Sequence, residues 1–217
     1  VSSAASDVYK RQTQSILNAY DESGFMPEWA SPGHRECMIG NNSISLSSDA
    51  WMKGIRTICP EKALEAMIHQ TEARHPGISS VGRDGFGYYD RLGYVPYPEV
   101  HEGTAKTLEY AYADWCVARF ADSIGRKEIA DTYYRKALNY RNLYYPDYGF
   151  MWAKDANGKW RDAFDATEWG GPFTEGSSWH WTWSVLHDPE GLSRLMGGHT
   201  AMEARLDSMF TAPNTYN

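Results

Sequence analysis

The sequence predicts an all-α fold in which pairs of helices stack around a common axis, an α/α toroid with long aromatic-rich loops and one small β-hairpin. Several segments repeat apolar residues at helical spacing, whereas no segment of comparable length alternates as a strand would. The order helix, loop rich in glycine and aromatic residues, helix also recurs along the chain. A plain helical bundle would explain the helices equally well. It would not explain why the loops are long and full of tryptophan and glycine.

The first helix is expected over residues 13–22, where Ile16, Leu17 and Tyr20 fall on one face. Residues 1–12, VSSAASDVYKRQ, show no apolar periodicity, and the chain starts at Val1 rather than at a methionine. We therefore expect residues 1–12 to be a non-native leader or linker and residues 13–217 to be the folded domain.

Further elements are expected where helical spacing continues between prolines, glycines and capping residues. Helices are expected over 45–56, from 60 onward, and over 104–124, 127–144, 177–186, 189–195 and 200–210. The long segment 75–103 should form a binding loop with one helical turn near 88–92. A β-hairpin is expected over 150–164, with Asn157 and Gly158 at its turn.

Charge and composition exclude several classes of partner. The chain has 217 residues and a net charge of −7, from 21 Lys and Arg against 28 Asp and Glu, and it has no basic run, so nucleic acid is a poor partner. No stretch approaches the roughly 20 apolar residues of a membrane-spanning helix, and no signal-peptide pattern is present. Cys37, Cys59 and Cys116 lack zinc-ligand spacing. Three free thiols are favoured, and one disulfide stays open.

The aromatic content points to a carbohydrate site. Nine Trp, fifteen Tyr and seven Phe make up 14% of the chain, and flat ring faces stack on sugars while carboxylates bind hydroxyls. Six of the nine tryptophans lie between residues 151 and 187. The same segment holds the carboxylates Asp155, Asp162, Asp165, Glu168 and Glu175.

Glu175 is the strongest candidate for a catalytic acid. Glycoside hydrolysis needs one protonated carboxyl beside the leaving oxygen and a second carboxylate that activates water or attacks carbon. Burial among aromatic rings favours the neutral form of a carboxyl group, which suits the acid, and Glu175 stands in PFTEGSSWHWTW at the start of a Trp-rich helix. The structural alternative is that Glu175 only complements the helix N-terminus beside a Ser177 cap.

Several segments together resemble glycoside hydrolase family 92, the calcium-dependent exo-acting α-mannosidases. They are GFMPEW, CMIGNNSISLSSDAWMKGI, GYVPY, KTLEYAYADWCVARFADSIG, GFMW and FTEGSSWHWTWSVLHDPEGLSRLMGG. The resemblance runs from about residue 18 to residue 210. The last segment is the most specific, because TEG, the alternating tryptophans, HD and LMGG follow one another in the family's order.

This resemblance implies an incomplete (α/α)6 glycosidase catalytic domain with about half of its helices. The family inverts the anomeric carbon of terminal α-mannose on glycans such as N-glycans, and Glu175 matches its general acid. It also implies Ca²⁺ on the sugar hydroxyls, with most ligands downstream, so no residue here is assigned to a metal. The general base, the downstream half of the toroid and an N-terminal β-sandwich would lie outside this chain, which should be inactive alone. A secreted, periplasmic or cell-surface location follows from the family.

Other residues are candidates for the sugar pocket. Trp179 is expected to stack on a sugar because it is near Glu175, and His180 is favoured as a sugar contact rather than a metal ligand. Glu28 and Trp29 are expected in the pocket wall. Two departures from the family pattern leave subsite preference open: Ser177 and His180 replace Asn and Gln, and the segment before CMIG reads His34, Arg35, Glu36.

Three further residues are interpreted structurally. Glu109 and Asp114 are favoured as buried ion partners, and Asp188, directly before Pro189, as a helix N-cap. Two other functions stay open at this point. They are another (α/α)6 carbohydrate-active enzyme and a non-catalytic carbohydrate-binding module.

Overall fold

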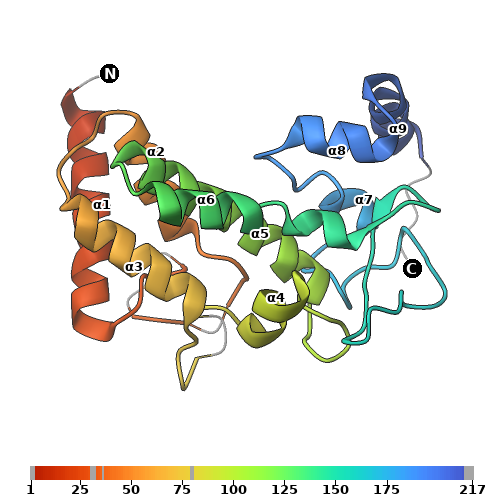
Figure 1. Ribbon diagram of the computed structural model, residues 1–217, viewed down its shortest axis with the longest axis horizontal. Helices are drawn as coiled ribbons and strands as arrows, with labels where there is room; N and C mark the ends of the chain where they lie inside the picture. Colours follow the sequence, from red (N-terminus) through yellow and green to blue (C-terminus); the bar gives the residue numbers. More distant parts are fainter. Residues whose placement is uncertain (1–2, 30–32, 36, 79–80, 213–217) are drawn as a thin grey trace. The chain divides into compact units, whose positions relative to one another are not determined.

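The computed structural model describes residues 3–29, 33–35, 37–78 and 81–212, with no side-chain account of residues 3–6. These residues are mostly helical, as the sequence predicts (Figure 1). They divide into two compact units. The first comprises Val1–Phe86 and Ala113–Ala137, and the second Gly87–Tyr112 and Leu138–Asn217.

The first unit is built from α1 (Ser3–Ser23), α2 (Asn42–Met52), α3 (Pro60–Glu72), the end of α5 (Gly103–Ser123) and α6 (Lys127–Lys136). In it α1 packs against both α2 and α3 (Figure 1). Helix α3 begins at Pro60, which suits a first-turn position, and Leu64 and Met67 are buried on its inner face. Helix α1 begins ten residues earlier than expected, at Ser3.

Asparagine capping sets the start of α2. The side chain of Asn41 accepts a hydrogen bond from the backbone N–H of Ile44 at 3.2 Å, so the helix begins at Asn42 rather than at residue 45. Ile44, Ala50 and Trp51 of α2 are buried, and the Trp51 ring contacts Phe120 of α5 at a centroid distance of 5.3 Å.

The second unit contains most of α4 (Phe86–Leu92), the start of α5, the 3-10 helix η1 (Asn139–Leu143), and the helices α7 (Ser178–Trp181), α8 (Pro189–Met196) and α9 (His199–Thr211). Its core gathers the buried residues Tyr94, Leu108, Ala111, Tyr140, Leu143, Tyr144, Met151, Val185 and Leu192. The helix expected over 127–144 is therefore interrupted. It ends at Lys136, and η1 places Tyr140 and Leu143 in this core.

The predicted β-hairpin exists but lies earlier in the chain. Strands β1 (Tyr144–Tyr145) and β2 (Phe150–Met151) pair antiparallel, and the turn between them ends at Gly149, which has a φ of +71°. The expected turn at Gly158 is also present, but only one isolated bridge, between Lys154 and Trp160, flanks it.

Candidate functional site: Glu175 and its surroundings

Glu175 lies two residues before Ser177, the N-cap of the single helical turn α7, and has an unusual backbone conformation. Its φ is +45°, in the left-handed region that costs a residue with a Cβ roughly 1–2 kcal/mol. Its side chain is exposed, and in the part of the chain that the structure describes its carboxylate has no hydrogen-bond or ion-pair partner. The prediction that aromatic rings bury this carboxyl is therefore wrong for this chain. Strained residues of this kind concentrate at functional sites.

The backbone on both sides of Glu175 is held by hydrogen bonds. The indole Nε1–H of Trp181 donates to the carbonyl oxygen of Thr174 at 2.8 Å. The carbonyl oxygen of Gly176 accepts from the backbone N–H of Gly170, also at 2.8 Å. The left-handed conformation of Glu175 is thus set by its surroundings.

Ser177 and His180 begin α7. The backbone N–H of Ser177 donates to Nδ1 of His180 at 3.2 Å, and the Ser177 hydroxyl lies 3.0 Å from the same nitrogen. Ser177 is thus the N-cap of α7, whereas the Glu175 carboxylate makes no hydrogen bond to this helical turn among the described residues. That arrangement favours a role for Glu175 other than helix capping.

His180 and Trp169 form an exposed aromatic pair beside Glu175. Their rings meet edge to face at 5.4 Å, and the Trp169 side chain is 49% exposed. A Cβ on Gly176, the residue after Glu175, would be only 3.3 Å from Cβ of His180, which shows that His180 lies close to the Glu175 segment. Trp169 did not stand out in the sequence, because it is separated from the Trp-rich helix by a glycine-rich loop.

Trp179 packs differently from the sequence prediction. Its ring is half-buried and lies edge to face against Phe150 at 4.7 Å. The residue of this helix that contacts the Glu175 segment is Trp181 instead. Helix α7 ends at Trp181, well before the expected end at residue 186. A stacking role for Trp179 stays a prediction.

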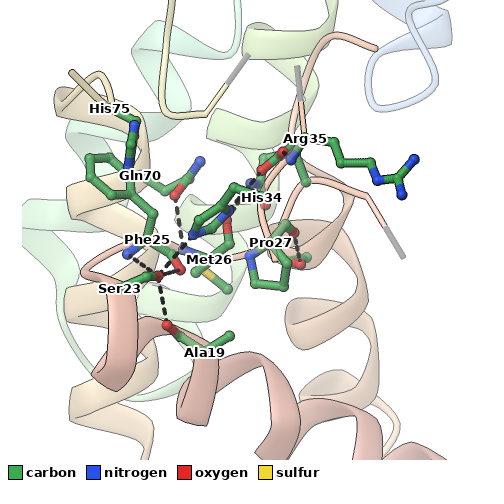
Figure 2. A network of polar contacts seen from close by, with 12 residues as sticks. Ala19, Ser23, Phe25, Met26, Pro27, His34, Arg35, Gln70 and His75 are labelled. Atoms are coloured by element: carbon green, nitrogen blue, oxygen red, sulfur yellow. Dashed lines mark hydrogen bonds and ion pairs between the residues drawn. The ribbon is translucent and has the colours of Figure 1, made fainter. Parts of the chain in front are cut away.

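Glu28 lies in the first unit. Figure 2 shows the network of polar contacts that includes its neighbours His34 and Arg35. The Glu28 side chain is almost fully buried. Oε1 accepts from the backbone N–H of Arg35 at 3.3 Å, and Oε2 lies 3.5 Å from Nδ1 of His34. Figure 2 shows His34 reaching back toward Ser23, and its Nε2 is 2.9 Å from the Ser23 hydroxyl. His34, a departure from the family pattern, therefore lies directly beside the Glu28 carboxyl group.

The loop that carries Glu28 is fixed at its backbone. The N–H of Met26 donates to Oε1 of Gln70 at 3.1 Å, and the Ser43 hydroxyl donates to the carbonyl oxygen of Pro27. Trp29, the next residue after Glu28, is 48% exposed. Glu28 and Trp29 belong to the first unit, whereas Glu175, Trp179 and His180 belong to the second. Glu36 lies outside the described residues.

Asp114 and Glu109 have different environments, although the sequence favours an ion pair for both. Asp114 is an ion partner of Arg83, as predicted. Glu109 is partly buried and has no hydrogen-bond or ion-pair partner among the residues with described placement. Loss of hydration raises the pKa of Glu109 from 4.5 to about 7.

Asp188 is the N-cap of α8, as predicted. Its Oδ1 accepts from the backbone N–H of Gly191 at 2.9 Å, and its Oδ2 accepts from Tyr140 and Arg141 at 2.7 and 2.8 Å. Burial alone would raise the pKa of Asp188, but these donors together lower it below its ordinary value.

The described residues bear on metal binding, disulfide formation and membrane insertion. Among the described residues, no three His, Cys, Asp or Glu side chains are grouped so that they could hold a metal ion. These residues alone therefore do not fit a calcium site. Cys37, Cys59 and Cys116 are free thiols. No described helix is both long and apolar enough to cross a membrane.

Comparison with known proteins identifies relatives whose names describe glycosidases and mannosidases. A protein of Arthroderma benhamiae described as an uncharacterized secreted glycosidase is 27% identical over 88% of this chain and 29% of its own length. The structure of the family GH92 inverting mannosidase BT2199 from Bacteroides thetaiotaomicron is 80% identical, with a TM-score of 0.93 over 97% of this chain and 29% of that one. The α-mannosidase BT3965 from the same species is 30% identical, with a TM-score of 0.85 over 95% of this chain and 27% of its own.

These matches confirm the predicted fold class, and the chain spans less than a third of the length of each relative. The sequence profile of the glycosyl hydrolase family 92 catalytic domain matches residues 2–217, which is nearly the whole chain. The chain therefore belongs to glycosyl hydrolase family 92.

Proposed function

We propose that this chain is part of the catalytic domain of an inverting exo-α-mannosidase in which Glu175 is the general acid. The observation that carries the proposal is the conformation of Glu175. A glutamate with φ of +45° and an exposed, unpartnered carboxylate is strained without any gain in stability from the described residues. The names of the similar structures, two of which are called mannosidases, support the substrate class.

In this mechanism Glu175 hands its proton to the departing glycosidic oxygen while water attacks the opposite face of the sugar. A sugar bound over the carboxyl would exclude water from it, and exclusion of water favours the neutral, proton-donating form. The exposed edge of His180 and the ring of Trp169 would contact the same sugar, with Trp179 as a further stacking surface. A role for Glu28 and Trp29 in a pocket wall stays a prediction.

The second carboxylate is proposed to come from outside this chain. An inverting enzyme keeps its acid and base about 6.5–9.5 Å apart, with room for water between them. A Ca²⁺ site is proposed to have its ligands outside this chain, because the described residues supply no cluster of ligands for it. A location outside the cytoplasm and action on N-glycans belong to the same proposal.

The proposal is tested by Glu175→Gln in the intact enzyme that contains this sequence. Turnover of α-mannosides with poor leaving groups should fall by roughly 10³-fold or more, whereas an activated aryl α-mannoside, which needs little protonation, should keep more of its rate. Glu203→Gln, at an exposed carboxyl of α9, is the control and should leave both rates unchanged. Equal losses on both substrates would contradict the acid assignment.

The 217-residue chain alone is expected to be inactive, because only the acid is assigned to it. Measurable hydrolysis of an α-mannoside by this chain would overturn that expectation. The base would then have to be one of the carboxylates Asp49, Asp165 and Glu168.

A further inference from the structure

We propose that Trp181 is a positioning residue for Glu175, acting through a single hydrogen bond from its indole N–H; this inference rests on the proposed function of Glu175. Nε1 of Trp181 lies 2.8 Å from the carbonyl oxygen of Thr174. That oxygen belongs to the peptide group that ends at the nitrogen of Glu175. Neither the composition of the chain nor the resemblance to the family identifies this contact.

The geometry of the peptide explains why this bond controls the direction of the carboxylate. The angle φ of Glu175 describes how the peptide between Thr174 and Glu175 is rotated relative to the rest of Glu175. A donor that fixes the carbonyl of this peptide therefore holds φ at +45°, a value that a free glutamate would leave for the allowed regions at negative φ. On the far side, the backbone N–H of Gly170 donates to the carbonyl of Gly176 and so fixes the peptide between Gly176 and Ser177, one peptide beyond the one that follows Glu175. The side chain of Glu175 then leaves the backbone in one direction.

Gly176 is part of the same arrangement. A Cβ at this position would lie 3.1 Å from Nε1 and 3.2 Å from Cδ1 of Trp181, which is tighter than ordinary contact. The φ of Gly176 is not in the positive region, so the residue is needed here for space rather than for backbone freedom. The absent side chain lets the indole approach the backbone on either side of Glu175.

Trp183 provides a matched control within the same segment. Both Trp181 and Trp183 are partly buried and pack against the same core of the second unit. The indole nitrogen of Trp181 has an acceptor, whereas the buried indole nitrogen of Trp183 has no hydrogen-bond partner among the described residues. Replacing each by phenylalanine removes a similar packing volume, but only the change at Trp181 removes a hydrogen bond.

The experiment compares Trp181→Phe, Gly176→Ala and Trp183→Phe in the intact enzyme. For an α-mannoside with a poor leaving group, Trp181→Phe and Gly176→Ala should each lower kcat by about 10- to 100-fold, because small displacements of a catalytic group cost factors of this size. KM should change less than about twofold, since a displaced acid affects proton transfer more than sugar binding. An activated aryl α-mannoside should lose less. Trp183→Phe should keep both rates within about twofold of the wild-type values.

A kcat for Trp181→Phe equal to that of Trp183→Phe would overturn the inference. If phenylalanine at 181 lowers the melting temperature, β-(3-benzothienyl)alanine at this position decides the matter, because its sulfur replaces the N–H at nearly unchanged shape. Full activity of that variant overturns the inference, and a selective loss of kcat on the poor leaving group supports it. Glu175→Gln separates the two proposals. If its loss of rate does not depend on the leaving group, the proposed function fails. If its loss does depend on the leaving group while Trp181→Phe behaves like Trp183→Phe, only the positioning role fails.

Discussion

Arg83 and Asp114, both in the first unit, form an almost completely buried ion pair. Nη2 of Arg83 lies 2.7 Å from Oδ1 of Asp114, and the two side chains are 3% and 0% exposed. The pair joins the segment before α4 to the middle of α5. A second ion pair of the same N···O distance, 2.7 Å between Lys53 and Asp49, lies on the surface with both side chains about half exposed.

Asp114→Asn should lower the free energy of unfolding by about 3–5 kcal/mol, because it leaves the Arg83 charge buried beside a neutral amide. Asp49→Asn should cost about 0–1 kcal/mol, since water already screens that pair. Urea denaturation of the chain followed by circular dichroism measures both. Losses of similar size would show that burial of the Arg83 pair has no energetic consequence.

Gly82 lies where a side chain has no room. Its φ is +81°, and a Cβ would stand 2.1 Å from the carbonyl oxygen of Ala73, which accepts the backbone N–H of Arg83 at 2.8 Å. Gly82→Ala should therefore cost more than about 2 kcal/mol, from strain together with the displaced hydrogen bond. Gly24 is the control, because its φ is +79° but nothing lies within 4 Å of a Cβ there. Gly24→Ala should cost only about 1–2 kcal/mol in a thermal melt, the strain term alone.

Glu109 should make stability depend on pH. Its folded pKa of about 7 lies above the unfolded value of 4.5, so between these pH values the folded chain binds more protons than the unfolded chain. The contribution of Glu109 to the free energy of unfolding is therefore complete below pH 4.5 and is lost as the pH rises through 7. Glu109→Gln should therefore be more stable than the wild type by roughly 1–3 kcal/mol at pH 8, and nearly equal to it at pH 4.5.

The measurement is the unfolding free energy at several pH values between 4.5 and 8. Glu203→Gln, at an exposed position, should keep the wild-type slope. A Glu109→Gln slope identical to that of the wild type would contradict the assignment.

Local sequence signals located most of the helices but not their ends. Pro60 correctly marked the start of α3, and Asp188 with Pro189 marked the start of α8. The expected helix over 127–144 failed because Tyr140 and Leu143 have burial partners that lie far away in the sequence. Residues 3–12 of α1 were missed because they carry few apolar residues at helical spacing. Whether they are native to the protein stays a prediction.

The candidate site was predicted by residue type and not by conformation. Motif and resemblance selected Glu175, but only three-dimensional contacts could show its left-handed backbone or its exposure. Trp179 was selected because it is near Glu175 in the sequence, whereas the hydrogen bond from Trp181 to Thr174 depends on how a one-turn helix folds back. The pairing of His34 with Glu28 likewise depends on the path of a loop that has no periodic signal.

The left-handed backbone at residue 175 lowers the stability of the fold at the position of the proposed catalytic acid. Glycine adopts that conformation freely, so Glu175→Gly should raise the melting temperature, by an amount corresponding to about 1 kcal/mol, while it removes the proposed proton donor. A screen for thermal tolerance alone would then enrich glycine at this position, and a screen for mannoside turnover would remove it. A glutamate at this position would then exchange some stability for activity, and its positive φ is the structural sign of that exchange.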